Sequence, residues 1–492
     1  MKYYIGIDIG TSSAKVILMD ENGKITGEAS REYAIEEPRP GWKQIDPEVW
    51  MRGTDEAMEQ LLEGCDPQEV EAIGVTGQMH TVVFLDENGE SIRPALMWND
   101  TRTKDMVSNL KEKIRRLPEA SHVASIISTG SPAVNLLWLK ENEPDSFHKM
   151  KKFLIGPDYI VYRLTGTMQT DYCEASTSSL CDLTTGTWSP EIRHLLDFPE
   201  EIYPEIKGTA VTAGMVQEEW RQKYGFGENV RVITGTGDNP AAAIATGCFA
   251  RKYPVLSLGT SGVLMVPKSR IDFNARGKNI LFSMDGKEIS ILVQGVIQST
   301  GSSLGWWVKQ VLKTNDFAKE TETEEIEHLG ESPLIFYPHL AGDKTIYADP
   351  NLRGMFLGLG TDTTRKEMTL AVMEGICLAV RQLSEVMCLT KEELKGLKVT
   401  GGGSKNQVWM QMLADVLGTE VQQMESGAGA GYGIALAAAG SQGEISMEEI
   451  LNHTVKIKKT FFPRTYNQNL YEEKYQKYQK IYQCYQEIMG KE

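Results

Sequence analysis

The chain has few cysteines and no C-x-x-C pair; its seven cysteines are scattered over 492 residues. This spacing is typical of free thiols and argues against a disulfide framework or a zinc site. No uninterrupted apolar run reaches the length of a membrane span, and Met1 leads directly into a strand pattern without the basic and apolar segments of a signal peptide. The sequence therefore predicts a cytoplasmic protein that has no membrane partner.

The chain also lacks an excess of positive charge. Its formal net charge is −16, and a general nucleic-acid surface would require a basic face. We therefore expect no nucleic-acid partner. Any anionic ligand must be neutralised locally by a metal ion, by backbone N–H groups or by selected Lys and Arg side chains.

Two common nucleotide-binding signatures are missing. The sequence contains no G-x-x-x-x-G-K-[ST], and neither 235–240 nor 401–406 completes G-x-G-x-x-G. These absences exclude a P-loop and a Rossmann dinucleotide site. A chain of this length predicts at least two domains, and because no low-complexity linker occurs, we place the boundary in the crossing segment near 245–254.

The stretch VITGTGDNPAAAIATG at 232–247 stands near the middle of the chain. It predicts a strand, a glycine turn and a helix that begins at Pro240, with Asp238 or Asn239 capping the first turn. Such a turn presents an acid at the carboxyl end of a strand, where open α/β sheets bind their ligands. From this stretch alone, Asp238 is either a helix cap or a functional acid.

Two hairpins of the same design open the two halves of the chain. Residues 3–19 alternate and break at Gly10-Thr11-Ser12-Ser13, and residues 254–267 break at Gly259-Thr260-Ser261-Gly262. Backbone N–H groups and hydroxyls in such loops can cradle phosphate. Asp8 ends the first strand, where a carboxylate beside phosphate could hold Mg²⁺. The repetition predicts duplicated domains that face one nucleotide.

Other polar residues follow predicted strands. Gly401-Gly402-Gly403 stand between the strand LKVT and a helical segment, which favours a ligand at the helix N-terminus. Gln78, Met79 and His80 stand at a turn, where His80 is either a ligand contact or a structural histidine. Six tyrosines between 466 and 485 form, from Tyr471, one stripe of a C-terminal helix that we expect to pack on the second domain.

Taken together and in order, these motifs resemble those of the FGGY family of carbohydrate kinases. The resemblance rests on D-x-G-T-S at 8–12, S-L-G-T-S-G at 257–262, G-D-N at 237–239, the late G-G-G, and GWKQIDPEVW at 41–50. It implies an α/β fold of two ribonuclease-H-like (actin-like ATPase) domains with an interdomain cleft, an N-terminal domain at 1–246 and a C-terminal domain at 247–492. It also implies an enzyme that uses ATP and Mg²⁺ to phosphorylate a small-molecule sugar.

The resemblance implies roles for individual residues. Asp238 would be the general base that takes a proton from the attacked hydroxyl, and Asp8 would coordinate Mg²⁺ or position the transferred phosphate. The sugar would contact Gln78, Met79, His80, Asn99, Asp100 and Asn239. The nucleotide would contact Thr11, Ser12, Ser13, Gly259, Thr260, Ser261, Gly301, Gly305, Gly402, Gly403, Asn406 and Gln407.

Within the family, GQMH at 77–80 and LMWNDTR at 96–102 are most similar to the xylulose kinases, which implies a ketopentose acceptor, D-xylulose first. The chain departs from their pattern at Thr81, at Asn135 and at Asp343-Lys344-Thr345-Ile346. These departures leave ribulose, ribitol, glycerol, erythritol and gluconate open as acceptors. A catalytically silent ATP-dependent sensor and a homodimer also stay open.

Overall fold

The computed structural model describes residues 1–492 except 323–325, 426–428, 442–448, 450, 453–454 and 491–492. The first half of the chain is built around a seven-stranded sheet. Antiparallel β1 and β2 form the predicted first hairpin, and parallel β5 and β14 follow on the other side of β1. In order across the sheet, the strands are β13 (Thr212–Met215), β14 (Arg231–Ile233), β5 (Val70–Gly77), β1 (Tyr3–Ile9), β2 (Ser13–Asp20) and β3 (Ile25–Glu32), with β15 (Thr236–Gly237) also paired to β5.

The second half repeats this arrangement. The hairpin of β16 and β17 is antiparallel, and β22 and β23 run parallel on the other side of β16. The strand order is β18 (Lys278–Phe282), β19 (Ser290–Ile297), β17 (Gly262–Lys268), β16 (Val255–Leu258), β22 (Leu397–Thr400), β23 (Val421–Met424) and β24 (Ile457–Phe461). Both sheets therefore have the ribonuclease-H-like topology, which confirms the predicted fold class and the predicted duplication.

Smaller sheets and helices complete the first half. A four-stranded sheet places the segments 77–82 and 96–102 near the end of β5. The elements are β4 (Gln44–Ile45), β7 (Ala95–Leu96), β6 (Val82–Leu85), β8 (Lys152–Ile155), β9 (Gln169–Asp171), β10 (Cys181–Asp182), β11 (Thr187–Trp188), β12 (Glu205–Lys207), α1 (Pro47–Leu62), α2 (Val107–Arg115), α3 (Pro132–Asn142), α4 (Pro144–Lys149), α5 (Gly156–Thr165), α6 (Tyr172–Thr177), α7 (Pro190–Leu196), α8 (Glu218–Tyr224), α9 (Asp238–Ala245) and α10 (Cys248–Arg251).

Helices of the second half pack around its sheet, and a π-helical turn at 306–311 continues α11. The elements are α11 (Gly301–Gly305), α12 (Phe317–Thr321), β20 (Ile335–Tyr337), β21 (Met355–Leu357), α13 (Arg365–Val386), α14 (Gln407–Leu417), α15 (Ala430–Gly440), α17 (Thr465–Tyr478) and α18 (Ile481–Met489). The tyrosine stripe lies as predicted, because Tyr471, Tyr475 and Tyr478 are buried in the core of this half.

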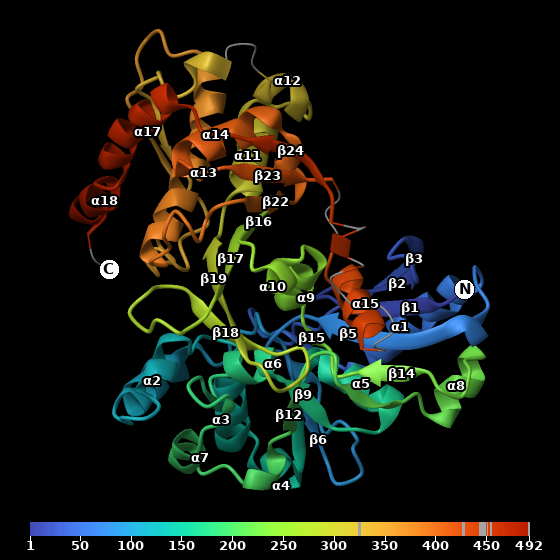
Figure 1. Ribbon diagram of the computed structural model, residues 1–492. Coiled ribbons are helices and arrows are strands. Elements are labelled where there is room, and N and C mark those ends of the chain that lie inside the picture. The colour runs from blue at the N-terminus through green and yellow to red at the C-terminus, as the bar shows by residue number, and fades with distance from the viewer. Residues whose placement is uncertain (323–325, 426–428, 442–448, 450, 453–454, 491–492) are drawn as a thin grey trace.

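Helix α15 comes late in the chain but covers the sheet of the first half, as Figure 1 shows by its red ribbon over the blue strands. Glycines allow this close approach: a Cβ on Gly6 would lie 1.9 Å from the carbonyl oxygen of Gly431, and a Cβ on Gly433 would lie 1.8 Å from that of Ala241. A division of the chain at residue 246 stays a proposal, and it would assign α15 to the half whose sheet it does not cover.

The β18–β19 hairpin links the second half to the first. The backbone N–H groups of Thr209 and Ala210 donate to the carbonyl oxygens of Ser283 and Met284, at 2.7 and 2.9 Å. The N–H of Leu281 in β18 donates to Ser176 Oγ in α6 at 3.0 Å, and Figure 1 shows this hairpin reaching α6. The hairpin therefore places residues of the second half beside helix α6.

Two sequence predictions concern the chain as a whole. All seven cysteines are free, as predicted. Among the described residues, no helix has both the length and the apolar character that crossing a bilayer requires.

Candidate functional site

Two carboxylates lie at the same edge of the first sheet. Asp8 is next to the last residue of β1 and pairs with Thr76 of β5, and Thr76 pairs on its other side with Thr236 of β15. Asp238 follows β15 directly. Because strands in a sheet are about 5 Å apart, the backbones of Asp8 and Asp238 are about two strand spacings apart across the end of β5.

The structure corrects the prediction for the helix start after β15. Helix α9 begins at Asp238 and not at Pro240, and Gly237 is its N-cap. The extended backbone of Gly237 turns the strand into the helix, so Pro240 falls within the first turn, where its missing N–H is tolerated. Neither Asp238 nor Asn239 is the cap. Instead, Asp238 Oδ1 accepts a hydrogen bond from the Asn239 N–H at 2.7 Å.

The two carboxylates have raised pKa values. Burial raises the pKa of Asp8 to about 6, against an opposing effect of Lys15. Burial, and secondly the charge of Asp8, raise the pKa of Asp238 to about 7. A carboxylate whose pKa lies near neutral pH is suited to accept a proton from a reacting hydroxyl.

The first hairpin loop is held in place by side chains from three segments. The carbonyl oxygen of Gly10 accepts from Tyr33 Oη at 2.6 Å and from Gln78 Nε2 at 3.3 Å. Trp98 Nε1 donates to Thr11 Oγ1 at 3.1 Å. The loop is therefore fixed beside Asp8, while the side chain of Ser12 stays exposed. The predicted phosphate contacts of Thr11, Ser12 and Ser13 stay a prediction.

Several polar side chains surround Gly237 and Asp238, and we call Gln78, Met79, His80, Glu174 and Asn239 the Asp238 cluster. A Cβ on Gly237 would lie 2.5 Å from Met79 Cγ and 2.8 Å from Glu174 Oε1. Asn239 Nδ2 contacts Met79 Sδ at 3.8 Å, and the His80 N–H donates to Glu174 Oε2 at 3.4 Å. The structure thus brings the predicted residues Gln78, Met79, His80 and Asn239 together near Asp238.

Buried polar atoms in this region have no partner among the described residues. They are Gln78 Oε1, His80 Nδ1, Glu174 Oε1 and the nearby Asn99 Oδ1. Because buried polar atoms are normally hydrogen-bonded, these atoms fit a ligand that carries several hydroxyl groups.

Sequence reasoning missed Glu174 and Lys278. Glu174 is fully buried on α6, and its pKa lies well above the usual range because of burial and of the charges of Asp171 and Asp158. Lys278 begins β18, and its Nζ lies 2.9 Å from His80 Nε2. Neither residue stands in a motif, since one lies in a short helix and the other at the start of a strand from the opposite half.

Asp100 differs from the other predicted sugar contacts. Its Oδ1 accepts from the Arg102 N–H at 2.7 Å, and its Oδ2 accepts from the Lys43 N–H at 2.7 Å and from Arg102 Nε at 2.9 Å. Both side chains of this ion pair are buried. The structure therefore uses the Asp100 carboxylate to hold the 96–102 segment, and the contact of Asp100 with a ligand stays a prediction.

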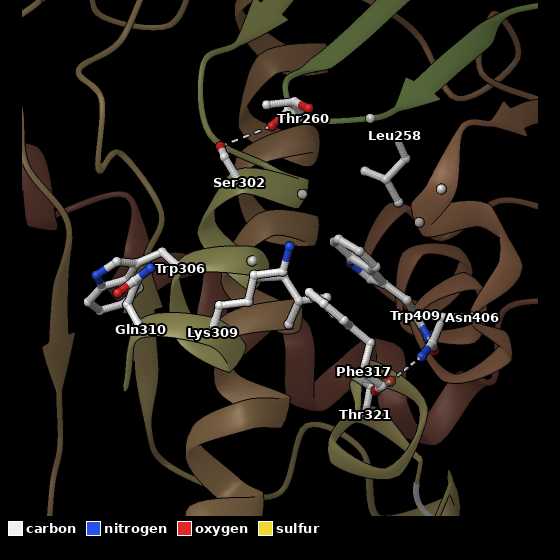
Figure 2. A pocket seen from close by; sticks show the side chains of 16 residues that line it. Leu258, Thr260, Ser302, Trp306, Lys309, Gln310, Phe317, Thr321, Asn406 and Trp409 are labelled. Carbon is white, nitrogen blue, oxygen red and sulfur yellow. Dashed lines mark hydrogen bonds between the residues drawn. The ribbon is translucent and has the colours of Figure 1, made fainter. Parts of the chain in front are cut away.

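A second ligand-sized space lies at the corresponding edge of the second sheet. This cavity measures about 780 Å³, which is within the usual range for small-molecule sites. It lies where β16 and β22 end and α14 begins (Figure 2). Of the residues predicted to contact nucleotide in this half, those that line it are Gly259, Thr260, Gly301, Gly305, Gly402, Gly403 and Asn406.

Ser261 and Gln407 are outside this lining. The side chain of Gln407 donates to Gln423 Oε1 at 3.1 Å and accepts from Lys459 Nζ at 2.8 Å. Asn406 has a structural task as well, because its Oδ1 caps α14 through the Trp409 N–H at 2.9 Å. The predicted nucleotide contact of Gln407 is therefore less well supported than that of Asn406.

Two glycines shape the cavity wall. A Cβ on Gly301 would lie 2.4 Å from the carbonyl oxygen of Gly259, so this position requires glycine for the close approach of α11 to the second hairpin. A Cβ on Gly305 would meet nothing within 4 Å. Gly305 therefore opens the wall to the cavity.

Aromatic and basic side chains in the wall were not predicted. Figure 2 shows the Lys309 amine directed into the space between Ser302 and Trp409. Trp306 and Lys309 lie on the π-helical turn, a local form that often occurs at functional sites. Phe317 and Trp409 also line the space. Flat aromatic faces beside a cation suit a ligand that combines an aromatic ring with negative charge.

In the part of the chain that the structure describes, no three His, Cys, Asp or Glu side chains come together in a group that could hold a metal ion. A magnesium site does not require such a group, since Mg²⁺ is usually held by one or two carboxylates with phosphate oxygens and water. No hydrogen bond or ion pair within the described residues engages the Asp8 carboxylate, so this donor fits the ion.

Comparison with known proteins identifies the same family for both halves of the chain. The model of the N-terminal domain of the FGGY family of carbohydrate kinases matches residues 3–245, and that of the C-terminal domain matches residues 255–441. The chain is 32% identical over 489 residues to a xylulose kinase of Bacillus subtilis, covering 98% of this chain and 97% of the other. A xylulose kinase of Lactococcus lactis is 32% identical over 499 residues, with 99% and 98% covered. A solved structure of a xyloylose kinase from Brucella ovis superposes with a TM-score of 0.88 at 28% identity, covering 99% and 100%.

Proposed function

The chain belongs to the FGGY family of carbohydrate kinases and is an ATP-dependent sugar phosphotransferase; on this premise we propose that it phosphorylates a primary hydroxyl of a ketopentose, D-xylulose first. The observation that carries the proposal is the position of Asp238. This carboxylate has a pKa near 7 and stands one strand away from the turn that holds Met79 and His80.

Asp238 is the proposed general base. Its deprotonated carboxylate accepts the proton of the acceptor hydroxyl as the oxygen attacks the γ-phosphorus of ATP, and the bond to the β-phosphate oxygen breaks to release ADP. Phosphoryl transfer requires mainly positioning and charge stabilisation, so a carboxylate is a sufficient base. The raised pKa makes Asp238 a stronger base than an exposed aspartate while it is still largely ionised above pH 7.

Asp8 and the two hairpins are proposed to position the phosphates. Mg²⁺, when bound at Asp8, would neutralise negative charge on the transferred group. The backbone of the 259–261 turn and the fixed loop at 10–13 would hold the phosphates from the two sides. The aromatic residues of the cavity would hold the adenine ring, with Lys309 near the charged part of the nucleotide.

The proposed acceptor site is the Asp238 cluster with Asn99. Its unpartnered atoms, Gln78 Oε1, His80 Nδ1 and Asn99 Oδ1, match the donors and acceptors of a polyhydroxylated molecule. The choice of D-xylulose is supported by the names of the relatives and by the GQMH segment, whereas Thr81 and Asn135 differ from the pattern of the xylulose kinases.

Coupled measurement of ADP release tests the proposal directly. The panel contains D-xylulose, D-ribulose, ribitol, glycerol, erythritol and D-gluconate, and we expect D-xylulose to give the highest kcat/KM among the neutral acceptors. D-ribulose in first place would keep the ketopentose assignment and replace D-xylulose, whereas ribitol, glycerol or erythritol in first place would replace the ketopentose assignment. ADP release that no acceptor stimulates would favour the silent sensor over the kinase.

A further inference from the structure

One lysine from the second half of the chain, Lys278, lies against the Asp238 cluster, and a second, Lys344, is exposed to solvent close enough for its charge to act on His80. Lys278 Nζ and His80 Nε2 are 2.9 Å apart. The pKa of His80 lies well below its usual value because of burial and of the charges of Lys278 and Lys344. The neutral ring therefore accepts from Lys278 at Nε2 and carries its proton on Nδ1, which has no partner among the described residues.

The loop that carries Lys344 is tied to the strand pair of Lys278. Thr345 Oγ1 accepts from the Val296 N–H in β19 at 3.0 Å, and the carbonyl oxygen of Ile346 accepts from Arg276 Nη1 at the approach to β18. Asp343 Oδ2 accepts from the Tyr347 N–H at 2.6 Å. These bonds fix Lys344 near Lys278, close enough for the charge of Lys344 to lower the pKa of Lys278.

The two ammonium groups have no matching carboxylate. No ion pair with Lys278 or Lys344 occurs in the part of the chain that the structure describes. Glu174 is the neighbouring acid, but burial and the charges of Asp171 and Asp158 hold its pKa well above the usual range, which favours its neutral form. Burial also lowers the pKa of Lys278 to about 8, so most of this group is still charged at neutral pH. Lys344 is exposed to water, so a bound anion would compensate mainly Lys278, with Lys344 within reach of the same anion.

The position of Lys278 indicates whether the anion is a phosphate of the nucleotide or a group on the acceptor. Lys278 pairs with Gln294, and Gln294 pairs with Met265 of β17, which starts at Gly262 directly after the second hairpin turn. Lys278 is thus two strands across and three residues along from that turn, about 10 Å in each direction. The pair of lysines lies away from the expected phosphate position and beside the acceptor site.

We propose that Lys278 and Lys344 bind a carboxylate at the end of the acceptor opposite to the phosphorylated hydroxyl, so that the protein also accepts sugar acids of the aldonate class. The inference rests on the proposed kinase function. A neutral ketose offers these cations only hydroxyl oxygens, whereas an aldonate offers a charge-assisted bond to each ammonium group. Lys278 is the residue to test, because its Nζ lies directly against His80 of the acceptor site.

The experiment compares kcat/KM for D-gluconate and D-xylonate with kcat/KM for D-xylulose in three variants. In Lys278→Met, the ratio of aldonate to D-xylulose should fall about 10–100-fold, as expected for a lost bond to a charged group. In Lys278→Arg the ratio should stay within about 3-fold of the wild-type ratio, because the charge is retained. Lys287→Met, a matched change at an exposed lysine of the β18–β19 hairpin, should leave the ratio unchanged.

Three results would overturn the proposal. The wild-type protein could phosphorylate a neutral acceptor and neither aldonate. Lys278→Met could lower kcat/KM for all acceptors equally, which would mean that Lys278 has a structural role between the two halves. It could also raise only the KM for ATP, which would mean that the lysines bind the phosphates of the nucleotide. If no acceptor stimulates ADP release, the kinase proposal fails, and calorimetric titration of D-gluconate into wild-type and Lys278→Met protein still tests the anion site.

Discussion

At the scale of single residues, Asp238 combines a backbone position and an environment that serve one purpose. The helix N-terminus at Gly237 directs its carboxylate towards the edge of the sheet, and one oxygen is fixed by the Asn239 N–H. Burial and the neighbouring Asp8 raise its pKa against a smaller opposing effect of backbone hydrogen bonds. The residue is therefore both oriented and basic.

Replacing Asp238 by asparagine should lower kcat by roughly 10²–10⁴-fold, the usual contribution of a general base. Binding of ADP, measured by calorimetry, should stay within about 3-fold of the wild-type affinity, because the proposed nucleotide cavity is on the other sheet. Asp145→Asn, an exposed position on α4, is the matched control. Turnover of Asp238→Asn close to wild type would remove the base assignment.

The pKa values of the carboxylates predict the pH profile of kcat/KM for the acceptor at saturating nucleotide. The base acts when deprotonated, so activity should fall about tenfold per pH unit below pH 7, where Asp238 takes up a proton. The fall should steepen below pH 6, where Asp8 is protonated as well. A profile that stays flat down to pH 5 would contradict the raised pKa values.

The pH dependence of the stability towards urea offers an independent check on the raised pKa of Asp238. Because the folded-state pKa of Asp238 lies above the value in the unfolded chain, the charged carboxylate destabilises the folded protein above pH 7, and this cost disappears as the pH falls through 7 towards 4. Asp238→Asn should therefore unfold at a higher urea concentration than wild type at pH 8. The difference should shrink at pH 5.

At the scale of elements, the proposed nucleotide cavity is formed by three chain turns that each follow a strand. The hairpin turn at 259–261 and the glycines at 401–403 end β16 and β22, and α11 is packed on the hairpin through Gly301. The π-helical turn then directs Trp306 and Lys309 to the cavity. The wall is thus made by backbone geometry, and its side-chain chemistry comes from this turn together with Phe317 of α12 and Trp409 of α14.

Gly305 allows this wall to be tested without disturbing the fold. Gly305→Leu should place a side chain in the cavity, because a Cβ there meets nothing within 4 Å. We expect the KM for ATP to rise at least about tenfold, which corresponds to about 1.4 kcal/mol, because the leucine side chain would occupy space that the nucleotide needs. The KM for the acceptor should change by less than about 3-fold. Equal changes in both constants would mean that the cavity does not hold the nucleotide.

At the scale of the whole molecule, the two halves share a core. Residues of α15 pack with Tyr4 and Ile17 of the first sheet and with Ile244 of α9 in one buried cluster. Helix α9 carries Asp238 at its start, so α15 supports the position of the proposed base from a distant part of the chain. The first half therefore depends on the second for a covered sheet.

A fragment of residues 1–246 should accordingly be unstable. Without α15, the apolar face formed by Tyr4, Ile17 and Ile233 would be exposed, and we expect aggregation or binding of a hydrophobic dye, measured beside the full chain. Joining residues 430–440 to the fragment through a flexible linker should restore a cooperative thermal transition. A monomeric fragment 1–246 that melts cooperatively would show that the first half is an independent domain.

The sequence alone determined the parts whose information is local. Strand alternation, the two Gly-Thr-Ser turns and the glycine run after LKVT are short-range patterns, and they predicted the two hairpins, the duplication and the glycines of the cavity wall. The ribonuclease-H-like fold followed from the resemblance of these motifs, taken in order, to one family. The same patterns gave a wrong helix start where two neighbouring positions can both begin the helix. The helix after β15 starts at Asp238 because Gly237 turns the chain, although Pro240 and its neighbours form an acceptable start two residues later.

Only the tertiary structure decided which distant residues meet. Glu174 and Lys278 carry no motif, and their proximity to His80 arises because the β18–β19 hairpin of the second half is bonded to the first. Asp100 is a strand-end acid by sequence, yet the fold places Arg102 and the Lys43 N–H on its oxygens. Charge balance and pKa values depend on such contacts between segments far apart in the chain, so no local pattern encodes them.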